Sequence, residues 1–106
     1  MSERRSYTRK ELRLDVDVEA NGQTTERQTL NLSMVGLFVE ASKPHPVGTR
    51  VVVSLRLPKG PQPVEVLSEV AHSVPGSGMG FRFLEFREDG RERLLAFLGP
   101  ETRNDG

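Results

Sequence analysis

The sequence predicts a mainly β fold, a small antiparallel barrel of six or seven strands with one C-terminal helix. Short stretches of β-forming residues recur along the chain and are separated by Gly, Pro and Asn, whereas helical spacing is confined to the C-terminal region. With 106 residues, of which 35% are hydrophobic, the chain has room for one domain with a single core. A series of short strands followed by one helix favours a closed or nearly closed barrel.

The first half of the chain predicts three strands. Residues 12–19 alternate between apolar and charged side chains, which is typical of a strand with one face in water. The Asn-Gly pair at 21–22 is a strong turn signal, and the Thr-rich residues 24–32 are expected to form the returning strand. The short apolar stretch 36–41 predicts the third strand.

The second half predicts three more strands. Residues 50–57 have the clearest strand pattern in the sequence, and Pro-containing loops precede and follow them. Residues 64–74 are long enough for one extended strand. A turn at 75–78 then leads into a last strand at 79–86, which is rich in phenylalanine.

The end of the chain predicts the only helix. Glu88 and Asp89 suit the positive end of a helix dipole, and Gly99-Pro100 is a stop signal. Because so small a core needs a lid, we expect this helix to cap the barrel rather than pair with a second chain. The apolar side of the helix consists of Leu94, Leu95, Phe97 and Leu98.

Charge divides the chain into an arm and a body. The 15 basic and 15 acidic side chains balance, which argues against a general polyanion binder. The first 13 residues nevertheless hold five basic and two acidic side chains, so a basic arm is expected to meet an anion. We expect a flexible basic arm at 1–11, a barrel with its helix at 12–99 and a frayed tail at 100–106.

Several classes of function are poorly supported. The chain has no cysteine, which excludes thiol nucleophiles, disulfides and thiolate metal sites. His45 lies between two prolines and His72 within a predicted strand, and neither has a nucleophile or a metal-ligand spacing beside it. No apolar stretch is long enough to span a membrane. We therefore expect a non-enzymatic cytoplasmic protein without membrane insertion, metal or cofactor.

Two motifs are more informative. The first is an RxxxR spacing, Arg5 to Arg9, just before the first predicted strand. The second is an NxSxxG spacing, formed by Asn31, Ser33 and Gly36 where the third strand begins. The RxxxR spacing alone is common in this sequence and the NxSxxG spacing is only moderately specific, so their order and position carry the information. Arginine offers five donors in a rigid fork that pairs with phosphate oxygens or with the edge of guanine.

This arrangement resembles the PilZ domain family, whose signature is RxxxR followed by [D/N]xSxxG. The resemblance extends from about Arg4 to the helix, and the GMGFRF stretch at 78–83 is similar to a late glycine-rich strand of the family. The resemblance implies a single-domain, PilZ-type β-barrel with cyclic di-GMP as its ligand and no enzymatic activity.

The chemistry of the motifs suits that ligand, which presents two phosphates and two guanines. The motif arginines can pair with phosphates or guanines and stack on the bases. The asparagine amide can accept from guanine N1 and N2, and the serine can bind a phosphate or brace the turn. The glycine is expected either to take a positive φ or to let the ligand approach the backbone. The predicted ligand-binding residues are Arg5, Arg9, Asn31, Ser33 and Gly36, with Arg4 as a further candidate cation.

The predicted function is a cyclic di-GMP receptor or adaptor that signals to an unidentified protein effector through ordering of its arm, as a monomer or weak dimer. One alternative is a PilZ-like protein-interaction module that binds no nucleotide. Another is a small barrel that binds nucleic acid, which needs exposed aromatics and a basic groove. Since Tyr7 is the only tyrosine and tryptophan is absent, we expect no nucleic-acid partner.

Overall fold

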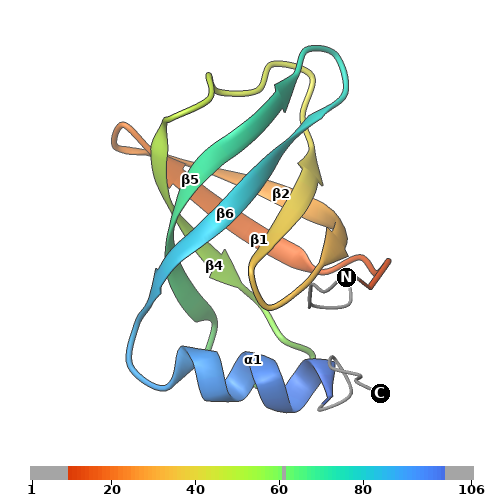
Figure 1. Ribbon diagram of the computed structural model, residues 1–106, viewed down its shortest axis with the longest axis vertical. Coiled ribbons are helices and arrows are strands. Elements are labelled where there is room, and N and C mark those ends of the chain that lie inside the picture. Colours follow the sequence, from red (N-terminus) through yellow and green to blue (C-terminus); the bar gives the residue numbers. More distant parts are fainter. Residues whose placement is uncertain (1–9, 61, 100–106) are drawn as a thin grey trace, which may run out of the picture.

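Six strands form the wall of a closed antiparallel barrel in the computed structural model, which describes residues 10–60 and 62–99 (Figure 1). The order of hydrogen-bonded neighbours is β1-β2-β3-β6-β5-β4, and β4 pairs with β1 to close the wall. This confirms the predicted fold class, with six strands rather than seven. The predicted arm up to residue 9 and the predicted tail at 100–106 lie outside the described residues. The strands are β1 (Asp15–Ala20), β2 (Gln23–Leu32), β3 (Gly36–Glu40), β4 (Arg50–Leu55), β5 (Val64–Val74) and β6 (Gly78–Phe86).

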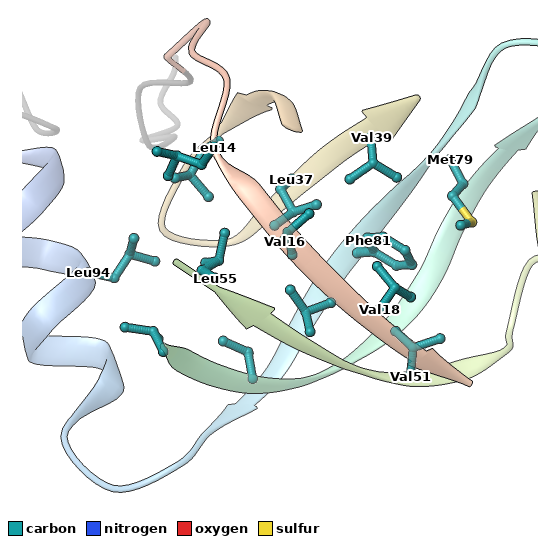
Figure 2. Close-up of a cluster of buried hydrophobic side chains, with 14 of the residues drawn as sticks. Leu14, Val16, Val18, Leu37, Val39, Val51, Leu55, Met79, Phe81 and Leu94 are labelled. Carbon is teal, nitrogen blue, oxygen red and sulfur yellow. The ribbon is translucent and has the colours of Figure 1, made fainter. Parts of the chain in front are cut away.

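The interior of the barrel is filled by the apolar members of the alternating strands. Val16 and Val18 of β1 point inward, as do Val51 of β4 and Phe81 of β6 (Figure 2). Their polar neighbours along each strand lie on the outer surface. A ligand that binds to the barrel wall therefore contacts the outer face of the strands.

The first strand begins later than its alternating pattern predicts, because a side chain interrupts the ladder. The regular strand starts at Asp15. The buried hydroxyl of Thr29 on β2 accepts a hydrogen bond from the Leu14 N–H (2.9 Å) and donates one to the Leu12 carbonyl (2.7 Å). Residues before β1 are thus held against β2 by this hydroxyl together with a backbone bond from the Thr29 N–H to the Leu14 carbonyl (3.0 Å), outside the regular strand.

The helix α1 (Gly90–Leu98) lies across one end of the barrel (Figure 1). Leu94 and Leu98 are buried in the core, which confirms that this helix caps the barrel. Phe97 does not take part in the cap as expected, since 38% of it remains exposed. Gly99 ends the helix with a φ of 95°. In the described part of the chain, neither α1 nor any other helix has the length and apolar character to cross a bilayer.

Candidate functional site

The NxSxxG motif forms the turn between β2 and β3. Asn31 lies near the end of β2, Ser33 in the turn and Gly36 at the start of β3. The buried Ser33 hydroxyl accepts a hydrogen bond from the Val35 N–H (3.1 Å) and lies 3.4 Å from the Gly36 carbonyl, to which it donates. The Ser33 N–H donates to the same carbonyl (2.9 Å). Of the two roles expected for Ser33, the structure therefore supports that of bracing the turn.

Gly36 is required for close packing of two strands. It does not take the positive φ that was one of its two expected roles. A Cβ at this position would lie 2.1 Å from the carbonyl oxygen of Phe81 on β6. Real Cβ atoms do not approach a backbone oxygen so closely, so any larger residue must push β3 and β6 apart.

A shallow hollow of about 500 Å³ lies beside this turn. Its centre follows the strand register: Asn31 on β2 is opposite Phe38 on β3, Phe38 is opposite Gly80 on β6, and Gly80 is opposite His72 on β5. Two of the three motif residues, together with side chains that are distant in sequence, therefore share one surface. The lining consists of Asn31, Val35, Gly36, Leu37, Phe38, Ala71, His72, Gly80, Phe81 and Arg82.

Gly80 of β6 keeps this hollow open. At Gly80, a Cβ would meet the Phe38 ring at 3.3 Å and the His72 ring at 3.4 Å, so these two side chains flank the bare backbone. The Phe38 ring also extends over Gly78. His72 reaches the outer face because the register of β5 shifts between Val70 and His72. The sequence gives no sign of this irregularity, and His72 was expected only to be a strand residue.

A further cation belongs to the lining. Arg82 on β6 is the register partner of Gly36 on one side and of Glu69 of β5 on the other. Its Nη2 lies 2.5 Å from the Glu69 Oε1. Sequence reasoning missed this residue, although alternation along GMGFRF places Arg82 on the same face as the glycines at 78 and 80.

The N-terminal arm joins the barrel at the motif turn. Lys10 and Leu32 exchange two backbone hydrogen bonds, of 2.8 and 2.9 Å. Leu32 is the residue between the asparagine and the serine of the motif. Lys10, which was expected to be part of the flexible arm, is therefore held against β2. The predicted cations of the site, Arg5, Arg9 and the further candidate Arg4, lie outside the described residues.

The remaining polar chemistry of the barrel serves its surface. Among residues 10–60 and 62–99, no three His, Cys, Asp or Glu side chains are grouped so as to hold a metal ion. Arg56 donates a 2.6 Å hydrogen bond to Asp17, and this bond together with the Asp17 charge raises the pKa of the exposed Arg56 guanidinium. Neither residue lines the hollow, so this ion pair links neighbouring strands outside the candidate site.

Solved structures share this architecture at low sequence identity, and two of them illustrate the likeness. The Bacillus subtilis inhibitor of motility, MotI/DgrA, superimposes with a TM-score of 0.74 at 20% identity, over 91% of this chain and 50% of that chain. The PilZ domain of CeSA from a cellulose-synthesizing bacterium gives a TM-score of 0.66 at 19% identity, over 87% of this chain and 96% of that one. At these identities the likeness shows the fold, and this chain spans half the length of MotI/DgrA.

Sequence comparison identifies the family. No curated protein sequence matches the chain. The family model described as the PilZ domain matches residues 3–99, which is nearly the whole chain and includes both motifs. Together with the six-stranded barrel and its C-terminal helix, this match shows that the chain belongs to the PilZ domain family.

Proposed function

We propose that this protein is a receptor for cyclic di-GMP that catalyses no reaction and passes the level of this second messenger to a protein partner. The observation that carries the proposal is the pair of backbone hydrogen bonds between Lys10 and Leu32 (2.8 and 2.9 Å). They attach the arginine-bearing arm to the NxSxxG turn, beside the hollow. Arg5 and Arg9 lie just before Lys10 in the sequence, so this attachment supports their use in a site at the turn.

The hollow suits the chemistry of this ligand. Its volume of about 500 Å³ falls within the range of about 300–1,000 Å³ that is usual for ligand sites. The Phe38 ring offers a face on which a guanine can stack, and the Asn31 amide can accept from guanine N1 and N2. The arginine forks of the arm supply bidentate partners for the phosphates.

The motif residues divide into two roles in this proposal. Asn31 lines the hollow and is assigned to direct contact with the ligand. Ser33 and Gly36 act by shaping the turn, because the serine hydroxyl is engaged with its own backbone and the glycine admits the neighbouring strand. Their substitution is therefore expected to weaken binding indirectly.

Signal output is proposed to follow from ordering of the arm. When the arginines of residues 1–11 engage the ligand, the arm lies over the barrel and changes the surface that a partner meets. The similar structures are named for an inhibitor of motility and for a protein of a cellulose-synthesizing bacterium. The occurrence of a similar barrel in two differently named proteins is consistent with an adaptor whose partner sets the pathway.

Isothermal titration with cyclic di-GMP tests the proposal, with GTP and cyclic di-AMP as ligand controls. The wild-type protein should bind cyclic di-GMP selectively, and the stoichiometry should give one or two molecules per site. Arg9→Ala should weaken binding by about 1.5–3 kcal/mol, the scale of a charged hydrogen bond. Arg13→Ala is the matched control, because Arg13 lies 3.7 Å from Glu40 and does not line the hollow.

A PilZ-like interaction module that binds no nucleotide is the second candidate. It is favoured by the internal roles of Ser33 and Gly36, since a motif used to build the barrel does not by itself require a ligand. Absence of heat, together with an unchanged melting temperature at high cyclic di-GMP, would support this candidate over the receptor.

A further inference from the structure

The outer face of β6 carries a cation that neither sequence motif contains. Arg82 lines the hollow, and its side chain is 58% exposed. Its register partner on β3 is Gly36, and the Arg82 Cα lies 3.5 Å from the position that a Cβ of residue 36 would occupy. Because residue 36 has no side chain, nothing from that position on β3 screens the guanidinium from the site.

A carboxylate faces the same guanidinium from the other side. Glu69 on β5 is the other register partner of Arg82, and its Oε1 is 2.5 Å from the Arg82 Nη2. The Glu69 side chain is 23% exposed, less than that of the arginine. This ion pair uses one guanidinium nitrogen, whereas the arginine fork carries five N–H donors.

We infer that Arg82 is a ligand-binding residue of this site and that Glu69 competes with a phosphate of cyclic di-GMP for it. The inference rests on the proposed function, because it adds a residue to the same site. Carboxylate and phosphate both present paired oxygens to the arginine fork, so they are alternative partners. An exposed ion pair is weak, which allows a ligand phosphate to displace Glu69.

The competition has a consequence for the sensitivity of the receptor. In the free protein Glu69 neutralises Arg82. The ligand must therefore break the Arg82–Glu69 ion pair before its phosphate can pair with the arginine. The Kd for cyclic di-GMP is therefore higher than it would be with a free guanidinium. Glu69 thereby sets the ligand concentration at which the receptor responds.

The test is calorimetric titration of cyclic di-GMP into four proteins: wild type, Arg82→Ala, Glu69→Gln and the double variant. Arg82→Ala should raise the Kd about tenfold or more, as expected for loss of a charge-assisted hydrogen bond. Glu69→Gln should lower the Kd about twofold to threefold, because the exposed pair that it breaks is weak. The double variant should have the Kd of Arg82→Ala, because Glu69 acts through the arginine.

Arg87→Ala is the matched control. Arg87 follows β6, pairs with a glutamate of β5 (Glu65, 3.3 Å) and is 57% exposed, but it does not line the hollow. The Kd of the Arg87→Ala protein for cyclic di-GMP should equal that of the wild type. The gain in affinity expected for Glu69→Gln cannot arise from partial unfolding, so the test is decisive even if Arg82→Ala is less stable.

The outcomes separate this inference from the proposed function. If the wild type binds cyclic di-GMP and Arg82→Ala binds equally well, the assignment of Arg82 is overturned and the receptor function stands. If Glu69→Gln improves binding to the same extent without Arg82, the glutamate acts by repelling the ligand, and the competition is overturned. A wild-type protein that does not bind cyclic di-GMP overturns the proposed function itself.

Discussion

Two glycines that face the outside of the barrel have different structural reasons to be glycine. At Gly36 the nearest atom to a Cβ would be a backbone oxygen at 2.1 Å, and backbone cannot move without opening the sheet. At Gly80 the nearest atoms would be ring carbons of Phe38 and His72, at 3.3 and 3.4 Å. Side chains can rotate by the few tenths of an ångström that are needed. Gly36 is therefore a requirement of the fold, and Gly80 a determinant of the shape of the hollow.

The two alanine substitutions should separate these roles. Gly36→Ala should lower the free energy of unfolding by about 3 kcal/mol, the upper range for overpacking. Gly80→Ala should change it by less than about 1 kcal/mol but weaken cyclic di-GMP binding, because the new methyl group occupies the floor of the hollow. Urea denaturation and titration calorimetry measure the two effects. Equal losses of stability would contradict the distinction.

The place of each site residue in the chain explains whether the sequence can reveal it. Asn31, Ser33 and Gly36 are close in the chain, so any turn brings them together, and the motif predicts their neighbourhood correctly. Phe38 follows from the same β2–β3 hairpin, whereas Arg82 and Gly80 join them only because β3 pairs with β6, which is not its neighbour in sequence. The position of His72 depends in addition on a register shift in β5. Alternation does not encode either of these long-range relations.

At the scale of elements, the first hairpin depends on one buried hydroxyl. Asn21 and Gly22 both have positive φ, as the predicted hairpin turn requires, and this fixes the start of the β1–β2 pairing. At the other end of the pairing, the Thr29 hydroxyl bonds to the backbone of Leu14 and Leu12, in addition to the backbone bond from the Thr29 N–H to the Leu14 carbonyl (3.0 Å). This bonding explains why the strand pattern at 12–14 does not give regular strand there.

Thr29→Val should test the importance of this hydroxyl. The change preserves shape but leaves the Leu14 N–H and the Leu12 carbonyl without that partner, which should cost about 2 kcal/mol of stability. Thr25→Val is the control, since Thr25 is exposed on the same strand, and it should change stability by less than about 0.5 kcal/mol. Urea denaturation gives both values, and faster amide exchange at Leu14 in Thr29→Val should accompany the loss. A neutral Thr29→Val would show that water replaces the hydroxyl.

The arm is the second element with a testable role. Ligand binding should increase the hydrogen-exchange protection of amides in residues 1–11, because the arginines become fixed by the phosphates. The protection of Lys10 should change least, since its N–H already donates to the Leu32 carbonyl. Exchange measured with and without cyclic di-GMP, with Arg9→Ala as the control, gives the result. Identical protection in a protein that binds the ligand would contradict signalling through the arm.

At the scale of the molecule, a small barrel has two open ends and a small hydrophobic core. The helix α1 closes one end, and Figure 2 shows Leu94 directed from the helix toward the core near Leu55. The sequence predicts this cap from helical spacing and from the need to bury apolar surface. It does not predict that Phe97 stays 38% exposed. At about 100° per residue, Leu95 and Phe97 lie at the two edges of the apolar side, and only the contact with the barrel decides which edge is buried.

Leu94→Ala should therefore be the most destabilising change in the helix. Leu94 is fully buried, and its truncation leaves a cavity between the helix and the barrel that should cost about 3 kcal/mol. Phe97→Ala removes a larger but partly exposed side chain and should cost about 1 kcal/mol, in proportion to the area that it buries. Urea denaturation with an unchanged m-value measures both. If Phe97→Ala lowers the free energy of unfolding more than Leu94→Ala does, the helix packs against the barrel through the side that carries Phe97.

The folded Leu94→Ala protein should still bind cyclic di-GMP normally. The helix packs against Val64 at one end of β5, whereas the hollow includes His72 near the other end.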